Sequence, residues 1–249
     1  MSGHNKWASI KHKKAATDAK RGKIFTKIIR EIVVAAKEGG GVIENNARLR
    51  KAVDDAREAN MPQDNIKKAI QRGTGELPGA VYEENTYEGY GPAGVALIVE
   101  TTTDNKNRTA SEIRKIFSKH SGSMGESGCV GWMFSKKGFI SIDKSAGDED
   151  TIMTVALDAG AEDFVAEDDC YEIYTTTNDF NSVLDAIKAK NIPVAESEIT
   201  MIPQTYVKLE GDNAEHMLKL LDELEEHDDV KDVYSNFDIS KEDMEKYGA

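Results

Sequence analysis

The residues best suited to chemistry are the basic side chains at the start of the chain. Between His4 and Lys23, six lysines and one arginine accompany a single acid, Asp18, and Trp7 lies among them. A phosphate backbone is held by several cationic groups on one surface, because each neutralised phosphate releases a counterion. Aromatic rings and arginine can also stack on unpaired bases. The segment therefore predicts nucleic-acid binding. A solvated helix face, with Trp7 packed into its own domain, would explain the lysines but not the near absence of acids.

The candidate contact residues share a cationic, imidazole or aromatic side chain and lie in two stretches. The first stretch contributes Lys6, Trp7, Lys11, His12, Lys13, Lys14, Lys20, Arg21, Lys23, Lys27 and Arg30. The second contributes Lys106 and Arg108, in a polar loop that follows a strand and opens a helix, where backbone N–H groups can bind an anion. An ordinary turn held by Asp104 and Asn105 accounts for that loop equally well.

Charge is distributed unevenly along the 249 residues, whose net charge is −13. Residues 1–80 carry seventeen Lys and Arg against nine Asp and Glu, and residues 104–137 carry seven against three. Residues 138–249 carry eight against twenty-nine. Because the local field decides where a polyanion binds, a one-sided contact through the basic regions is compatible with the acidic total. The acidic C-terminal part is expected to repel polyanions and could contact basic proteins.

Motifs of enzymes are either missing or misplaced. Gly89–Gly94 matches G-x-G-x-x-G, but it precedes a predicted strand and contains Pro92, whereas a dinucleotide site needs the loop after a strand and before a helix. We expect Gly91 and Gly94 to be turn residues. No phosphate-binding Walker loop, H-E-x-x-H or C-x-x-C occurs. The sequence predicts no enzyme, no catalytic residues, no cofactor and no metal.

The remaining polar and sulfur-containing residues have plain interpretations. His216 and His227 lie among acids on one predicted helix, and we expect both to face solvent. The run Glu225, Glu226, Asp228 and Asp229 is expected to be a solubilising stretch around a turn. Cys129 and Cys170 are expected to be reduced, mostly buried thiols, with Cys129 on a strand.

The leading basic residues belong to a predicted helical region. Ile24, Ile28 and Ile32 recur every fourth residue from Lys23 onward, with Lys20, Lys23, Lys27 and Arg30 almost opposite. Gly39–Gly41 ends that helix. Further helices are predicted over residues 46–60 and from Pro62 to Gly73, followed by a linker over residues 73–79.

The rest of the chain alternates strands and helices. A strand is predicted over residues 94–101, a helix opened by the capping box Thr109–Glu112, and a strand over residues 129–134. From residue 138 to residue 201 the order is β-α-β-β-α-β, which is the ferredoxin-like signature. A strand at 205–209, a helix at 213–227 and a strand at 230–238 complete the chain.

The predicted fold class is α+β, with an N-terminal three-helix domain followed by two ferredoxin-like α+β domains, one inserted in the other. The unit at 94–134 and the last strand–helix–strand unit each lack partners, so we expect them to complete one another. The predicted domains are residues 1–79, residues 80–134 plus 204–249, and the insertion 135–203. The longest aliphatic run, Val95–Val99, is too short to span a membrane, and the start of the chain lacks a signal-peptide pattern.

Several blocks of the sequence resemble the YebC/PmpR family. They are MSGHNKWASIKHKKAATDAKRGKIFTKIIREI at 1–32, MPQDNIKKAIQRGTG at 61–75, YEGYGPAGVALIVETTTDNKNRT at 87–109 and FSKHSGSMGESGCVGWMF at 117–134. Cys129 and Gly131 depart from the family pattern. The resemblance implies a cytoplasmic, three-domain, non-enzymatic protein without cofactor or metal. Members are described as probable DNA-binding transcriptional regulators, and the mitochondrial branch and some bacterial members as acting on translation.

The leading functional hypothesis is a DNA-binding regulator of gene expression. The alternative is a ribosome- or RNA-associated translation factor, and a ligand-sensing or protein-interaction module is the third. The sequence shows no clear helix-turn-helix with Arg, Asn or Gln clustered at the start of a recognition helix, which weakens sequence-specific DNA reading. The expected partner is nucleic acid, DNA or RNA, with no membrane; we expect a monomer.

Overall fold

The computed structural model describes residues 18–247 and divides the chain into two compact units. One unit spans Trp132–Tyr206, and the segments before and after it form the other. Helices and antiparallel sheets follow one another in both α+β regions, so the α+β class is confirmed. No helix between Asp18 and Tyr247 is both long and apolar enough to cross a membrane.

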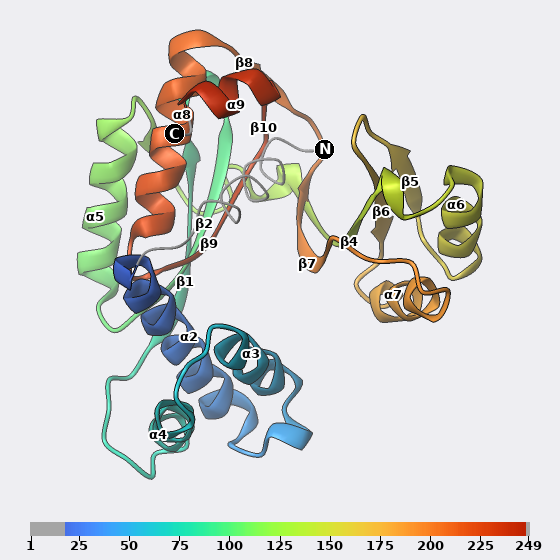
Figure 1. Ribbon diagram of the computed structural model, residues 1–249. Helices are drawn as coiled ribbons and strands as arrows, with labels where there is room; N and C mark the ends of the chain where they lie inside the picture. Colours follow the sequence, from blue (N-terminus) through green and yellow to red (C-terminus); the bar gives the residue numbers. More distant parts are fainter. Residues whose placement is uncertain (1–17, 248–249) are drawn as a thin grey trace. The chain divides into compact units, whose positions relative to one another are not determined.

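Three helices open the described chain, as predicted (Figure 1). They are α2 (Asp18–Gly39), α3 (Ala47–Glu58) and α4 (Gln63–Gly73). Gly40 follows α2 with φ +82°, the left-handed conformation that glycine adopts freely. The Asn46 side chain caps α3 by accepting a hydrogen bond from Leu49 N. α3 and α4 both pack on α2 around a core that includes Ile32, Leu49, Val53 and Ile66.

A four-stranded antiparallel sheet with two covering helices forms the second part of this unit. In spatial order its strands are β3 (Ser123–Met124), β1 (Glu83–Tyr90), β2 (Ala96–Thr103) and β9 (Val230–Ser235). The helices are α5 (Lys106–Lys119) and α8 (Gly211–Glu226), which lie side by side on one face of the sheet (Figure 1). The parallel pair β8 (Val207–Leu209) and β10 (Phe237–Ile239) and the short α9 (Lys241–Tyr247) complete it.

The strand β1 was not predicted, and it changes how this sheet is connected. Leu97, Val99 and Phe117 pack with the inner face of α8 in the core that β1 helps to cover. β1 takes the middle position that the third strand has in the ferredoxin-like order, while β8 pairs with β10 outside the sheet. The layer of four strands and two helices is thus retained with a different chain path.

The unit Trp132–Tyr206 has the predicted ferredoxin-like order. Its elements are β4 (Phe134–Asp143), α6 (Glu149–Asp158), β5 (Asp163–Ala166), β6 (Cys170–Thr175), α7 (Phe180–Ala189) and β7 (Glu196–Pro203). The sheet order is β5-β6-β4-β7, with every neighbouring pair antiparallel. Ile140, Ile173 and Ile187 lie fully buried between the sheet and the two helices. Alternating apolar residues on the strands and the helical period on α6 and α7 account for this core.

Two local predictions were wrong. Residues 129–131 form a loop and Gly131–Met133 a 3₁₀ turn, so the apolar run at 129–134 is not a strand. Helix α5 begins at Lys106, where Asn105 accepts from Arg108 N, so Thr109 is an interior residue and not a cap. In contrast, the interpretation of Gly91 and Gly94 as turn residues is confirmed: a 3₁₀ turn joins β1 to β2, and Gly94 has φ +79°.

Candidate nucleic-acid interface

The cations predicted along α2 lie against the C-terminal end of α8. Lys23 Nζ donates to Glu226 O at 3.1 Å, Lys27 Nζ donates to Glu225 O at 2.5 Å, and Arg30 donates to Asp228 O. The last carbonyls of a helix lack partners within the helix and carry its negative dipole end, so cations stabilise them. The stripe Lys23–Lys27–Arg30 therefore joins the helical domain to the second sheet in this structure.

Asp229 is the centre of that junction. Its side chain is 3% exposed, and its carboxylate accepts from Arg30 at 2.6 Å and from Arg108 at 3.1 Å. The hydroxyls of Thr103 and Thr109 donate to it at 3.0 and 2.6 Å. Burial alone would raise the pKa of Asp229, but the bonds from Thr109, Arg108 and Thr103 and the charge of Arg30 lower it to about 2. Asp229 is thus a buried, ionised anchor, and its interpretation as a solubilising surface acid was wrong.

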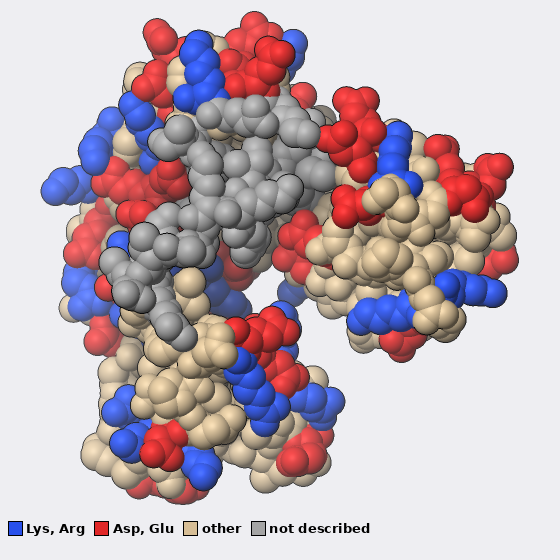
Figure 2. All heavy atoms as spheres, viewed as in Figure 1, with Lys and Arg blue, Asp and Glu red and all other residues tan. Residues whose placement is uncertain are grey.

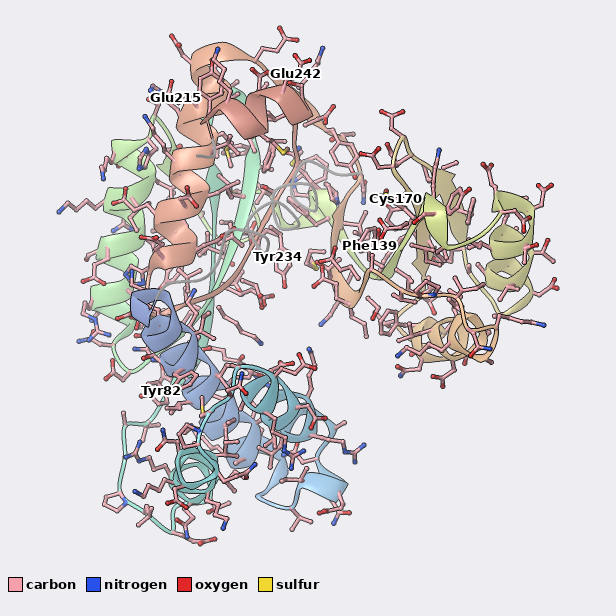
Figure 3. The ribbon with its side chains drawn as sticks, in the orientation of Figure 1. Tyr82, Phe139, Cys170, Glu215, Tyr234 and Glu242 are labelled. Carbon is pink, nitrogen blue, oxygen red and sulfur yellow. The ribbon has the colours of Figure 1, made fainter. Side chains whose placement is uncertain are left out.

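A second ionic cluster surrounds Arg48 on α3. Its guanidinium bonds Glu31 on α2 and Glu84 on β1, and Lys231 on β9 pairs with Glu31 at 3.2 Å. Burial opposes the charge of Glu31, but hydrogen bonds from Arg48 and the charge of Lys231 lower the pKa of Glu31 overall. Tyr82 lies beside α2 (Figure 3), with the Arg30 guanidinium 5.5 Å from its ring centroid. The helical domain is therefore held by several ion pairs and a cation–π contact.

A cavity beside these clusters has a volume of about 220 Å³. Lys27, Arg30 and Lys231 line it together with Asp55 and Asp228. Since cations and carboxylates alternate around it, the cavity has no single-sign field that would select phosphate.

Most of the leading basic segment lies outside the described residues. This holds for Lys6, Trp7, Lys11, His12, Lys13 and Lys14. Lys20 and Arg21 belong to α2, whose first turn carries no described side chains. Their contact with nucleic acid stays a prediction.

The two residues of the second stretch differ in their surroundings. Arg108 pairs with Asp104 and Asp229, and the Asn105 side chain caps α5. The hydrogen bonds expected of an ordinary turn held by Asp104 and Asn105 are therefore present. Lys106 is exposed and has no ion pair within residues 18–247. The anion-site interpretation of this loop stays a prediction that rests on Lys106.

The sequence reasoning missed a set of exposed cations on α4. Lys67, Lys68 and Arg72 are exposed, and none has a side-chain hydrogen bond or ion pair among the described residues. Gln63 and Asn65 are exposed beside them. The signal was present in the sequence as a lysine- and amide-rich face of the helix predicted from Pro62 to Gly73.

The loop before the inserted unit is organised by one carboxylate. Glu88 is 9% exposed and accepts from the backbone N–H groups of Gly128, Val130 and Gly131, each at 2.7 Å. Burial raises the pKa of Glu88, but these three hydrogen bonds lower it by more, so the pKa is lowered overall. The N–H groups that could hold a phosphate here are already satisfied by Glu88. Burial raises the pKa of both cysteine thiols, Cys129 in this loop and Cys170 on β6, which disfavours reactive thiolates.

One group of side chains has the composition of a metal site. Glu112, His227 and Asp229 place ligand atoms within 4.8 Å of one another. His227 Nε2 lies 2.9 Å from Glu112, and its Nδ1 accepts from Asp229 N at 3.1 Å, while Asp229 has its four donors. These partners already satisfy the ligand atoms without a cation. His227 is therefore not solvent-facing, which corrects the prediction, whereas His216 is exposed as expected.

The fold and these contacts define an α+β protein with a basic helical domain attached through an ionised acid. The chain belongs to the TACO1/YebC family, whose model of the N-terminal domain matches residues 5–76 and whose model of the second and third domains matches residues 82–237.

Relatives and a solved structure are similar over nearly the whole chain. A probable transcriptional regulatory protein of Endomicrobium trichonymphae is 69% identical over all of both chains. One of Trichlorobacter lovleyi is 61% identical over 99% of each. The crystal structure of the conserved hypothetical protein Aq1575 from Aquifex aeolicus matches with a TM-score of 0.77 and 44% identity, covering 90% of this chain and 93% of that one.

Proposed function

We propose that this protein is a regulator of gene expression that binds DNA through its basic N-terminal segment. The observation that carries the proposal is the basic start of an otherwise acidic chain, with six lysines and one arginine against one acid between residues 4 and 23. Its relatives are named probable transcriptional regulatory proteins, which supports the same class of process. In this proposal the protein acts in the cytoplasm without enzymatic chemistry, and its acidic C-terminal part repels the polyanion.

The structure suggests a division of labour among the candidate cations. Lys23 and Lys27 would have to leave the last carbonyls of α8, and Arg30 would have to leave Asp228 and Asp229, before they could contact phosphate. In the proposal these three residues position the helical domain, and the lysines that precede them bind the phosphate backbone of DNA. Lys106, exposed at the start of α5, adds a contact from the second region.

Salt dependence of binding tests this proposal. Replacing Lys11, Lys13, Lys14 and Lys20 with Ala should weaken binding of the full chain to duplex DNA at low salt. Each lost phosphate contact should reduce the slope of log K against log salt by about 0.9. A variant with Lys136, Lys188 and Lys190 replaced by Ala removes exposed cations from the inserted unit and should bind like the parent. A quadruple variant with unchanged affinity and slope would show that the surface is wrongly assigned.

RNA is the second candidate target, and exposed aromatic side chains favour it. Trp132 is 69% and Tyr206 46% exposed, at the start and end of the inserted unit. Such rings can stack on splayed bases of single-stranded RNA. If RNA is the target, the protein should sediment with ribosomes in cell extract, and Trp132→Ala should lower its affinity for single-stranded RNA. Sedimentation with the nucleoid would favour DNA.

A further inference from the structure

The second and third helices of the N-terminal domain are joined by a turn of the length found in a helix-turn-helix. α3 ends at Glu58 and α4 begins at Gln63, so four residues join them. Both helices pack on α2 and share its core, and Figure 1 shows α4 nearly end-on while α2 runs across the view. Two helices that meet only at a short turn, each supported by a third helix, make the frame in which DNA-binding proteins present a recognition helix.

The turn between the helices is fixed by its own residues. Asn60 has φ +58°, the left-handed conformation that this position of a helix-turn-helix commonly gives to glycine and that asparagine tolerates. Met61 follows it, is 4% exposed, and anchors the turn in the core. Its N–H donates to Ala56 O at 2.8 Å. Pro62 then supplies the fixed φ that suits the start of α4.

The inner face of α4 holds the helix against α2 and fixes which side chains point outward. Ile66 and Ala69 are buried, with relative exposures of 2% and 1%. At Gly73 an added Cβ would lie 2.5 Å from Val33 O, so only glycine allows the end of α4 to lie this close to α2. The outward face is thereby rigidly positioned, as base reading requires.

That outward face carries side chains of the types that can read bases in the major groove. Lys67, Lys68 and Arg72 are exposed cations, and Gln63 and Asn65 are exposed amides near the start of the helix. Within residues 18–247 none of the five has a side-chain hydrogen bond or ion pair. Arg and Lys donate to guanine, and Asn and Gln bond adenine through donor and acceptor together. Asp64 is the one acid on α4 and could accept only from a base amino group such as that of cytosine.

The charge of the motif matches a duplex. Residues 47–73 carry seven Lys and Arg against four Asp and Glu. The four acids comprise Asp64 and three on α3, where Asp54 and Asp55 pair with Arg57 and Lys51. Figure 2 shows basic and acidic side chains intermixed over this domain on the face in view. The excess of cations lies on α4, where a groove would receive it.

We propose that α3 and α4 form a helix-turn-helix whose α4 enters the major groove of duplex DNA and reads its sequence. The proposal rests on the proposed function and deepens it: the N-terminal segment supplies affinity for phosphate, and α4 supplies discrimination between bases.

The experiment selects preferred sites from random duplexes with the full-length protein and then measures affinities for the best site and a scrambled duplex. The parent should prefer its site, and the variants Gln63→Ala, Lys67→Ala and Lys68→Ala should each lower that preference about ten- to hundredfold. Replacing Lys11, Lys13, Lys14 and Lys20 with Ala should lower the affinity for both duplexes by the same factor. Lys188→Ala, which also removes one exposed cation, serves as the charge-matched control for Lys67→Ala and Lys68→Ala, and circular dichroism checks that each variant folds.

The outcomes separate this inference from the proposed function. If the protein binds duplex DNA without any preference, or if the α4 variants keep the preference, α4 does not read bases although nucleic-acid binding stands. If the α4 variants weaken only single-stranded RNA binding, the inference is overturned in favour of RNA. If the parent binds neither nucleic acid, the proposed function itself fails.

Discussion

Two basic helix faces of the N-terminal domain differ in their contacts: one is bonded to another part of the protein and the other is exposed to solvent. On α2, Lys23 and Lys27 donate to the last carbonyls of α8, and Arg30 donates to Asp228 O just beyond that helix. On α4, Lys67 and Lys68 are exposed without partners in the described part of the chain. Both faces look alike as sequence patterns. A basic helix face that is bonded to another element stabilises the contact between domains, whereas an exposed face without such bonds is available to bind phosphate.

The largest expected effect on stability comes from replacing Asp229, the acid that anchors the basic face of α2. Asp229→Ala removes the buried carboxylate that pairs with Arg30 and accepts from Thr103 and Thr109, so the free energy of unfolding should fall by about 3 kcal/mol or more. Asp228→Ala, at the exposed neighbouring position, should change it by no more than about 0.5 kcal/mol. Urea denaturation of both variants measures the difference. Equal stabilities would show that Asp229 does not anchor the junction.

The pH dependence of stability sharpens the same point. A carboxyl whose pKa falls from 3.8 to about 2 on folding stabilises the protein by about 2.5 kcal/mol at neutral pH. Because the folded pKa is the lower one, this stabilisation is complete above about pH 4 and is lost as the pH falls toward about 2. Denaturation series across this range should show the loss in the parent and a flatter profile in Asp229→Ala. Parallel profiles would contradict the assignment.

A smaller difference in stability is expected when one cation from each helix face is replaced. Arg30 is 14% exposed and bonds a buried carboxylate, so Arg30→Ala should cost about 2 kcal/mol of stability. Lys68→Ala removes an exposed, unpaired side chain and should change stability by less than about 0.5 kcal/mol. Thermal unfolding of the two variants gives the comparison. If Lys68→Ala were the more destabilising, α4 would have a structural role that its exposure does not suggest.

The periodicity of the sequence was sufficient for the helices and for the inserted sheet. Apolar residues at helical spacing located α2, α3 and α4, and alternation located the strands of the inserted unit. It failed where contacts distant in sequence dominate. The polar β1 lacks alternation and is stabilised by pairing with β2 and β3, while the apolar run 129–134 is bent into a loop by Glu88.

The candidate site was predictable only in part, for the same reason. The lysine spacing on α2 was visible, but not that α8 ends beside it, more than 190 residues later. Asp229 stands in an acidic run, and no local signal distinguishes it from Asp228. The proposed helix-turn-helix was not predicted, because its turn has Asn60 where glycine is usual and because the amides and cations are spread over the outward face of α4.

The most direct test of the central claim is the binding of purified full-length protein to labelled duplex DNA and to RNA, followed by fluorescence anisotropy over a series of salt concentrations. The account predicts binding in dilute buffer that weakens linearly on a log–log plot as salt is added. Failure to bind either nucleic acid at the lowest salt would contradict it.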